Sequence, residues 1–367
     1  MTLTINTQTL KEMVVKAAAC SSNNKLVPLT SLMCLQVDAK SDSDNQLTII
    51  TTDATNFLYT MEACSCESGF YAVCYTDQFM KLIPKINTEI VTLEVDDGVL
   101  YVYAKGKYAI ELPVDTDGSF VQYPNPLDET SYTPLKDRKT GIIKSDTVKA
   151  ITKAIEPALA DTMERAVLTY YYVGDKVIGS DGCIIAEFDE NLFNGEALMI
   201  SQDLMKLLGV LDGDIKYSID KESVTFSDEH CILYAKKTED AKNYYVRETT
   251  NFLATKFEHE VKLNKGELLG ALERITIFVD RLDDRALSLT FTPGELVIAN
   301  MKQKSVEGVD YSETNFTGEF ACNINVDMLT EQLKAYAGEV VTIKFGGTQA
   351  IELYADATKQ IISLMIK

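Results

Sequence analysis

Residues that could carry chemistry are few and scattered in this chain of 367 residues. Cys64 and Cys66 form a close pair, but a zinc site needs a second pair of cysteine or histidine ligands. The two histidines, His230 and His259, lie far from that pair in the sequence. Reduced cysteines usually behave as small apolar residues. The sequence therefore predicts no metal site and no cofactor.

Motifs of catalysis are equally scarce. The sequence contains neither a phosphate-binding GxGxxG or GxxxxGK[ST] loop nor a GxSxG nucleophile elbow. Both histidines stand in charged, connector-like stretches that are unsuited to a buried base. Asp96 and Asp97 could in principle bind Mg²⁺, but they precede Gly98 in a turn. We expect no catalytic residue and no enzyme, and keep a carboxylate-based nuclease or phosphatase as an alternative.

The overall charge bears on nucleic-acid binding. The net charge is −20, and an acidic chain lacks the basic surface that phosphate binding requires, unless its basic residues gather in one place. The distribution of the 35 Lys and Arg residues must therefore decide. The sequence also lacks a long apolar run and a signal-peptide pattern, so we expect a cytosolic protein.

A repeated pattern organises the chain. Near residues 75, 200 and 325 stand the stretches YTDQFMKLIPKINTEIVTLEVDDGVLYVYA, ISQDLMKLLGVLDGDIKYSIDKESVTFSD and NVDMLTEQLKAYAGEVVTIKFGGTQAIELYA. In each, apolar residues at helical spacing are followed by apolar residues that alternate with polar ones. This order predicts a short amphipathic helix and then a two-strand hairpin.

A second amphipathic helix opens each repeat. Its apolar positions are Leu10, Met13, Val14 and Ala17 in the first repeat, Val148, Ile151, Ile155 and Leu159 in the second, and Leu268, Leu272 and Ile275 in the third. Strand-like runs lie between the two helices. Each repeat thus predicts the succession β-α-β-β-β-α-β-β-β. We expect an α+β fold of three similar domains, spanning residues 1–125, 126–250 and 251–367.

The predicted helices carry basic residues on their polar sides. Any amphipathic helix has a solvated charged face, and glutamates such as Glu12, Glu156 and Glu273 interrupt this one. If the helices lined a channel, however, their cations would contact phosphates without reading sequence. The predicted DNA-binding residues are Lys11, Lys16, Lys25, Lys81, Lys149, Lys153, Arg165, Lys206, Lys265, Arg274 and Lys334.

At this point the chain resembles a known family, the bacterial sliding clamp, which is the β subunit of DNA polymerase III. The resemblance lies in the opening MTLTI, the stretches LVPLTSLMCLQV and LTIITTDATNFLY, the segment VIGSDGCIIAEF and the apolar tail IISLMIK. Departures also occur. Cys183 and Ile184 replace the family's His-Arg pair, and the stretch ANMKQKSVEGVDY lacks the family's acidic pattern.

The resemblance implies a homodimeric ring. Two three-domain chains would join head to tail, with helices inside and sheets outside, and would encircle double-stranded DNA. The edge strand near 107–112 of one chain would contact the third domain of the other. The implied interface residues are Tyr108, Ile110, Ile275, Ile277 and Phe278.

The resemblance also implies a groove for a partner peptide between the second and third domains. Its residues would be Val167, Ser180, Gly182, Cys183, Ile184, Ile185, Asn325, Met328, Ile361, Ile362, Ser363, Leu364 and Met365. The expected function is a processivity factor that tethers a DNA polymerase and is opened by an ATP-driven clamp loader. The alternative is a clamp-like scaffold that binds replication or repair partners without closing on DNA.

Overall fold

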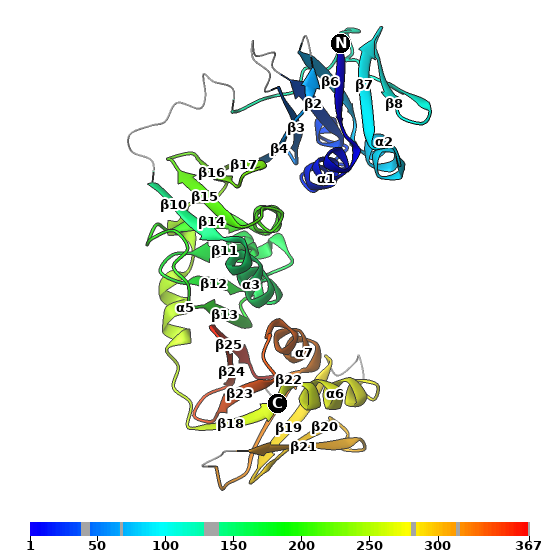
Figure 1. Ribbon diagram of the computed structural model, residues 1–367. Helices are drawn as coiled ribbons and strands as arrows, with labels where there is room; N and C mark the ends of the chain where they lie inside the picture. Colours follow the sequence, from blue (N-terminus) through cyan, green and yellow to red (C-terminus); the bar gives the residue numbers. More distant parts are fainter. Residues whose placement is uncertain (38–44, 67–68, 128–138, 280–283, 313–315, 366–367) are drawn as a thin grey trace. The chain divides into compact units, whose positions relative to one another are not determined.

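The computed structural model describes residues 1–37, 45–66, 69–127, 139–279, 284–312 and 316–365. They divide into two compact units (Figure 1), one made of 1–146 and 203–238 and the other of 147–202 and 239–367. Each unit is described by itself below. Within the described ranges, no helix has the length and apolarity needed to cross a membrane.

The first unit contains two antiparallel sheets. One has the strand order β5-β1-β7-β8-β9 and the other the order β10-β15-β16-β17-β4-β3-β2-β6. The elements are β1 (Thr2–Asn6), α1 (Thr7–Ala18), η1 (Pro28–Ser31), β2 (Leu32–Val37), β3 (Gln46–Thr52), β4 (Asn56–Ala63), β5 (Ser65–Cys66), β6 (Phe70–Tyr75), α2 (Thr76–Leu82), η2 (Ile83–Lys85), β7 (Ile90–Asp96), β8 (Val99–Tyr103), β9 (Lys107–Glu111), β10 (Lys139–Lys144), α4 (Gln202–Leu208), β15 (Asp214–Ile219), β16 (Ser223–Ser227) and β17 (Cys231–Lys236).

The second unit is built on one sheet of the order β14-β11-β12-β13-β25-β24-β23-β18-β21-β20-β19-β22. Its elements are α3 (Ser145–Ile155), η3 (Glu156–Ala158), η4 (Met163–Thr169), β11 (Tyr170–Val173), β12 (Val177–Ser180), β13 (Ile184–Phe188), β14 (Leu198–Ser201), η5 (Ala241–Asn243), α5 (Val246–Leu253), β18 (His259–Asn264), α6 (Lys265–Thr276), β19 (Ala286–Thr292), β20 (Glu295–Asn300), β21 (Val306–Ser312), β22 (Phe320–Asn325), α7 (Val326–Ala335), β23 (Val340–Phe345), β24 (Ala350–Ala355) and β25 (Thr358–Ser363). In sequence, α3 and α4 straddle the division between the units.

The predicted helix faces are confirmed. The apolar stripes of α1, α3 and α6 are buried throughout, as their helical spacing requires. Asparagines at positions 6, 264 and 325 begin α1, α6 and α7, and each side chain accepts hydrogen bonds from amides of the first turn. These helices therefore start at an asparagine that satisfies amides of the first turn.

The predicted succession within each repeat is wrong by one strand. Four main strands, not three, separate the two helices of each repeat, because β6, β14 and β22 lead directly into α2, α4 and α7. These strands lack a clean alternation of apolar and polar residues: β6 and β14 are almost wholly buried, and β22 contains two asparagines. A period of two is the signal by which a strand is found in a sequence, and here it is missing.

Two junctions of the same construction join the three domains. At the first junction β4 pairs with β17, from Thr60↔Cys231 to Asn56↔Ala235. At the second junction β13 pairs with β25, from Ile184↔Ile362 to Phe188↔Thr358. In both, the third main strand between the helices of one domain pairs antiparallel with the last strand of the next domain.

Candidate functional site

A tight turn at the second junction forms one wall of a cavity. Ser180 Oγ donates a hydrogen bond to the carbonyl oxygen of Ile184 and accepts one from the amide of Gly182. Asp181 accepts from the amides of Cys183 and Ile184 at 2.7 and 2.6 Å. Gly182 has a φ of +94°, which residues with a side chain rarely adopt. The turn is thus fixed by its own residues and presents Cys183 outward.

The second wall is helix α5. Figure 1 shows α5 on the side of strands β11–β13 that lies away from α3, and it contacts β13. Its buried residues Thr249 and Leu253 face the sheet. Between α5 and the turn lies a cavity of about 480 Å³, a size typical of sites for small molecules or a few side chains. It is lined by Arg165, Leu168, Ser180, Gly182, Cys183, Ile185, Tyr245, Glu248, Thr249, Phe252 and Ser363. We call this cavity the groove.

The lining of the groove is suited to binding a ligand and not to catalysis. Leu168, Ile185 and Phe252 supply apolar surface, and Arg165 and Glu248 are its charged lining residues. Partial burial, reinforced by the charge of Asp181, raises the pKa of the Cys183 thiol, although Arg165 acts in the opposite direction. The thiol is therefore protonated at neutral pH, and a protonated thiol is a poor nucleophile.

The predicted groove residues divide into two groups. Ser180, Gly182, Cys183, Ile185 and Ser363 line the groove. The others lie around it: Val167 packs against the apolar cluster beneath, while Ile184, Ile361 and Ile362 are buried. Met328, Leu364 and Met365 are half-buried.

Asn325, also predicted for the groove, has a structural task. Its Oδ1 accepts hydrogen bonds from the amides of Asp327 and Met328, and its Nδ2 donates to the carbonyl oxygen of Asp284. The side chain thus begins α7 and holds the preceding segment. The backbone amides of Leu364 and Met365 likewise donate hydrogen bonds to the carbonyl oxygens of Gln349 and Asn323. The apolar tail is thus fixed to the third domain.

Sequence reasoning missed α5 and the residues beside it. The stretch 236–250 reads as a charged connector, because large aliphatic residues are rare in it. The available signal was the spacing of Val246, Thr249 and Leu253, at i, i+3 and i+7, with Tyr245 and Phe252 alongside. Arg165, which we predicted to face DNA, lies on the groove.

Comparisons with known proteins bear on the fold. No protein-family model matches the sequence. The chain is 19% identical over 336 residues to the β sliding clamp of Chlamydia muridarum, with 88% of each sequence covered. The structure matches the DNA polymerase sliding clamp of Bacillus subtilis with a TM-score of 0.84 at 16% identity, covering 100% of this chain and 99% of the other. It matches the β subunit of DNA polymerase from Streptococcus pyogenes with a TM-score of 0.85 at 17% identity over 100% of both chains.

The chain has the fold of the bacterial β sliding clamps. The likeness extends over the whole chain, so the three domains of the clamp fold are all present. The predicted α+β class is confirmed.

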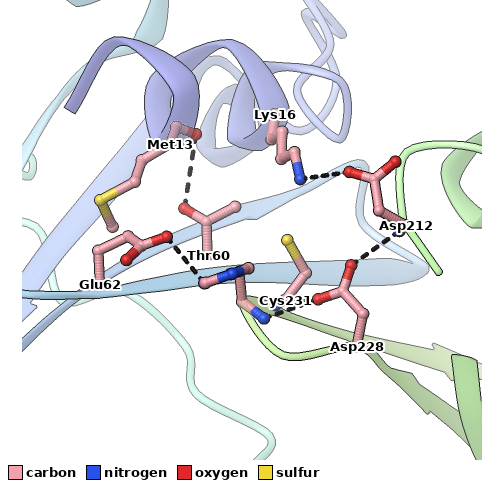
Figure 2. A network of polar contacts seen from close by, with 8 residues as sticks. Met13, Lys16, Thr60, Glu62, Asp212, Asp228 and Cys231 are labelled. Atoms are coloured by element: carbon pink, nitrogen blue, oxygen red, sulfur yellow. Dashed lines mark hydrogen bonds and ion pairs between the residues drawn. The ribbon is translucent and has the colours of Figure 1, made fainter. Parts of the chain in front are cut away.

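Most of the predicted DNA-binding residues lie on the helices of the clamp fold, and several are already engaged within the chain. Lys16 of α1 forms an ion pair with Asp212 at 2.8 Å (Figure 2). Lys81 pairs with Asp77 one helical turn away. The Arg274 guanidinium binds Glu307 through two nitrogens, and Lys265 Nζ donates to the carbonyl oxygen of Tyr336.

The remaining predicted cations are exposed or half-buried. Lys25, Lys149, Lys153, Lys206 and Lys334 are exposed, and Lys11 is half-buried. Apart from Lys25, all of these lie on α1, α3, α4 or α7. The positive charge carried by the helices of the clamp fold is therefore partly neutralised by carboxylates of the chain itself.

The predicted interface residues also divide into two groups. Ile110 and Ile275 are 6% and 3% exposed and belong to the cores of their domains, so they offer no apolar surface to a partner. Tyr108 on β9 is 42% exposed, and Ile277 and Phe278 at the end of α6 are 76% and 58% exposed. The side chains of this second group are exposed in the single chain, and their place at an interface stays a prediction.

Proposed function

We propose that this chain is a DNA polymerase processivity factor, which closes as a head-to-tail dimer around duplex DNA and tethers a polymerase through the groove. Support comes from the clamp fold over the full chain and from the names of its relatives, which are sliding clamps. In this role the chain is a non-catalytic subunit.

The repeated construction of the two junctions carries the proposal of a ring. Each junction joins the third main strand of one domain to the last strand of the next. By the same rule, β9 of the first domain lacks a partner strand from a preceding domain, and β21 of the third domain lacks one from a following domain. Among the described residues β9 pairs with β8 alone, and β21 pairs with β20 and, at its end, with β18. A second copy would supply both missing strands, and such heterologous contacts form a ring when the rotation closes.

In such a ring the contact with DNA is electrostatic and non-specific. Lysines such as Lys153 and Lys334 would reach phosphates, and contacts of this kind weaken with salt. Long residence would come from closure, because the ring leaves DNA only by opening or by sliding off an end. Opening would require a separate ATP-driven loader.

The groove supplies the attachment of the polymerase. Its apolar lining beside Arg165 and Glu248 suits a short peptide with aliphatic and aromatic anchors. Once the peptide is bound, the tether keeps the polymerase at a high effective concentration near the template.

We also propose where the three domains begin and end. We place them at residues 1–125, 126–250 and 251–367. The second limit falls inside α5, so this helix would serve both as the connector and as a wall of the groove.

The ring predicts a dimer in solution. Light scattering on a sizing column should give about twice the chain mass of 40.8 kDa. Charges placed on the exposed apolar pair by Ile277→Asp and Phe278→Asp should give monomers that remain folded, because both side chains are mostly exposed in the single chain. Lys221→Asp, at an exposed position between β15 and β16 in the first unit, is the control. A wild-type monomer at micromolar concentration would favour the scaffold that does not close on DNA.

A further inference from the structure

Helix α5 is weakly supported on both flanks. The groove lies along one side. A second hollow of about 420 Å³ lies along the other, where Val246, Thr250, Leu253 and Ala254 face Tyr172 and Ile178 of the sheet. The helix has only eight residues, and its N-cap residue Tyr245 makes no capping hydrogen bond through its side chain. Isolated helices of this length are unstable in water, so α5 depends on contacts made elsewhere.

One such contact comes from Lys359 on β25. Its Nζ donates a hydrogen bond to the carbonyl oxygen of Leu253, the last residue of α5. Carbonyl groups at the end of a helix lack partners within the helix, and a cation placed there also favours the helix dipole. Lys359 therefore caps the end of α5 opposite the uncapped Tyr245.

Lys359 is held in place by a buried carboxylate. Glu352 on β24 is 2% exposed, and its Oε2 lies 3.1 Å from Lys359 Nζ. Its Oε1 lies 2.7 Å from the Nζ of a second lysine, Lys344 on β23. Because a buried carboxylate is costly without partners, Glu352 fixes both lysines. Of the two, Lys359 makes the contact with α5 described above.

We propose that Lys359 is a positioning residue for partner binding, which holds α5 in the place where it forms a wall of the groove. The proposal rests on the groove being the peptide site of the proposed function. Lys359 itself does not line the groove, whereas α5 and its N-cap contribute Tyr245, Glu248, Thr249 and Phe252 to it. Release of the end of α5 would displace these four side chains together.

The two lysines provide a matched pair of variants. Lys359→Met and Lys344→Met each remove one of the two cations from Glu352, and both keep an unbranched side chain. Only the first removes the hydrogen bond to Leu253. If the lysines served only the stability of the sheet, Lys359→Met and Lys344→Met should change α5 exchange and peptide binding equally. If Lys359 positions α5, only Lys359→Met should change them strongly. Lys359→Arg keeps a cation and its donors and should behave like the wild type.

The experiment measures hydrogen exchange of the α5 amides and the binding of a short fluorescein-labelled peptide with Leu and Phe anchors, on the full chain. Lys359→Met should speed exchange at residues 246–254 and weaken peptide binding by about tenfold each, as expected for the loss of one charge-assisted hydrogen bond. Lys344→Met should leave both readouts within about twofold of the wild type, since the described ion pair of Lys344 is with Glu352 and it is Lys359 that donates to α5.

Three results would overturn the proposal: equal changes in the two variants, unchanged α5 exchange in Lys359→Met, or faster exchange with unaltered peptide affinity. Absence of peptide binding to the wild type would instead contradict the proposed use of the groove. In that case the exchange data alone still decide whether Lys359 holds α5.

Discussion

The first and second junctions share a backbone but differ in their side chains. Each has five paired residues between a third and a last strand. At the first junction the added contacts are polar and partly exposed: Lys16 forms an ion pair with Asp212, and His230 Nδ1 lies 2.9 Å from Glu62 Oε1. At the second, the contacts made near the end of α3 are neutral and buried: Gln332 donates to the carbonyl oxygen of Pro157, and Gln360 donates to that of Ala154. The backbone pairing sets the geometry, and the side chains set how each junction responds to charge and salt.

The connectors over the two junctions differ as well. In the first unit the segment 121–127 packs on one face of the eight-stranded sheet through Val121, Tyr123 and Leu127. Tyr123 is 8% exposed there, its Oη donates to the carbonyl oxygen of Leu32, and Tyr59 Oη donates to Asn125. In the second unit the connector forms α5 and leaves the groove open beside it. The groove of the second unit therefore lies beside a connector that is helical.

The largest expected effect is a charge placed in the neutral junction. Gln360 is 0% exposed, so Gln360→Glu would set a carboxylate against the carbonyl oxygen of Ala154 and cost roughly 3 kcal/mol or more at neutral pH. The pKa of the new carboxyl would rise, so the loss should shrink as the pH falls and it becomes protonated. Denaturant unfolding measures both effects. Gln360→Leu, without the charge, should cost roughly 1–2 kcal/mol, and equal losses in the two variants would show that charge is not the cause.

An intermediate effect is expected at the turns that the junctions share. Thr52 and Asp53 hold the turn of the first junction as Ser180 and Asp181 hold that of the second, but Ala54, with a φ of +90°, stands where Gly182 has +94°. Ala54→Gly should stabilise the chain by roughly 0.5–1 kcal/mol, because glycine adopts this conformation without strain.

The reciprocal variant at the second junction tests the equivalence of the two turns. Gly182→Ala should destabilise by roughly 1–2 kcal/mol through backbone strain. The Cβ of the new alanine would also lie 2.8 Å from a nitrogen of Arg165. The Arg165 side chain would therefore have to move within the groove, and peptide affinity should change. Thermal unfolding of both variants measures the strain. Similar melting temperatures for the two would contradict the equivalence of the turns.

The smallest effect is expected at the ionic junction. Partial burial lowers the pKa of Lys16, but the hydrogen bond and charge of Asp212, with nearby acidic groups, outweigh it and raise the pKa overall. The ion pair therefore stabilises the chain at neutral pH, and this stability is lost only as the pH rises through the raised pKa. A double-mutant cycle of Lys16→Met and Asp212→Asn should give a coupling of roughly 0.2–1 kcal/mol.

The two junctions should respond differently to salt. The coupling between Lys16 and Asp212 should largely vanish at about 1 M salt, where the Debye length is about 3 Å. The free energy of unfolding that is lost in Gln360→Leu should not change with salt, because this contact is neutral. A coupling that survived high salt would mean that the pair is shielded from solvent.

The sequence predicted those features that local periodicity encodes. The buried faces of α1, α3 and α6 follow from apolar residues three and four positions apart. The resemblance to the clamp segment marked Ser180, Gly182 and Cys183, which line the groove. Pairings between distant residues were beyond this reasoning: Lys16 meets a carboxylate 196 residues away, and Arg274 meets one 33 residues away. The burial of Ile110, which the resemblance assigned to the interface, was also beyond this reasoning. Alternation fixes which residues share a face, but not how far the core extends beneath that face.

The account rests on closure around DNA, and retention on DNA of defined topology measures it most directly. After loading, the chain should remain on nicked circular plasmid through a wash at high salt, and should be lost from the same plasmid once it is linearised, because only a ring can slide off an end. Equal retention on circular and linear DNA would contradict the account. Ile277→Asp with Phe278→Asp should be lost from both.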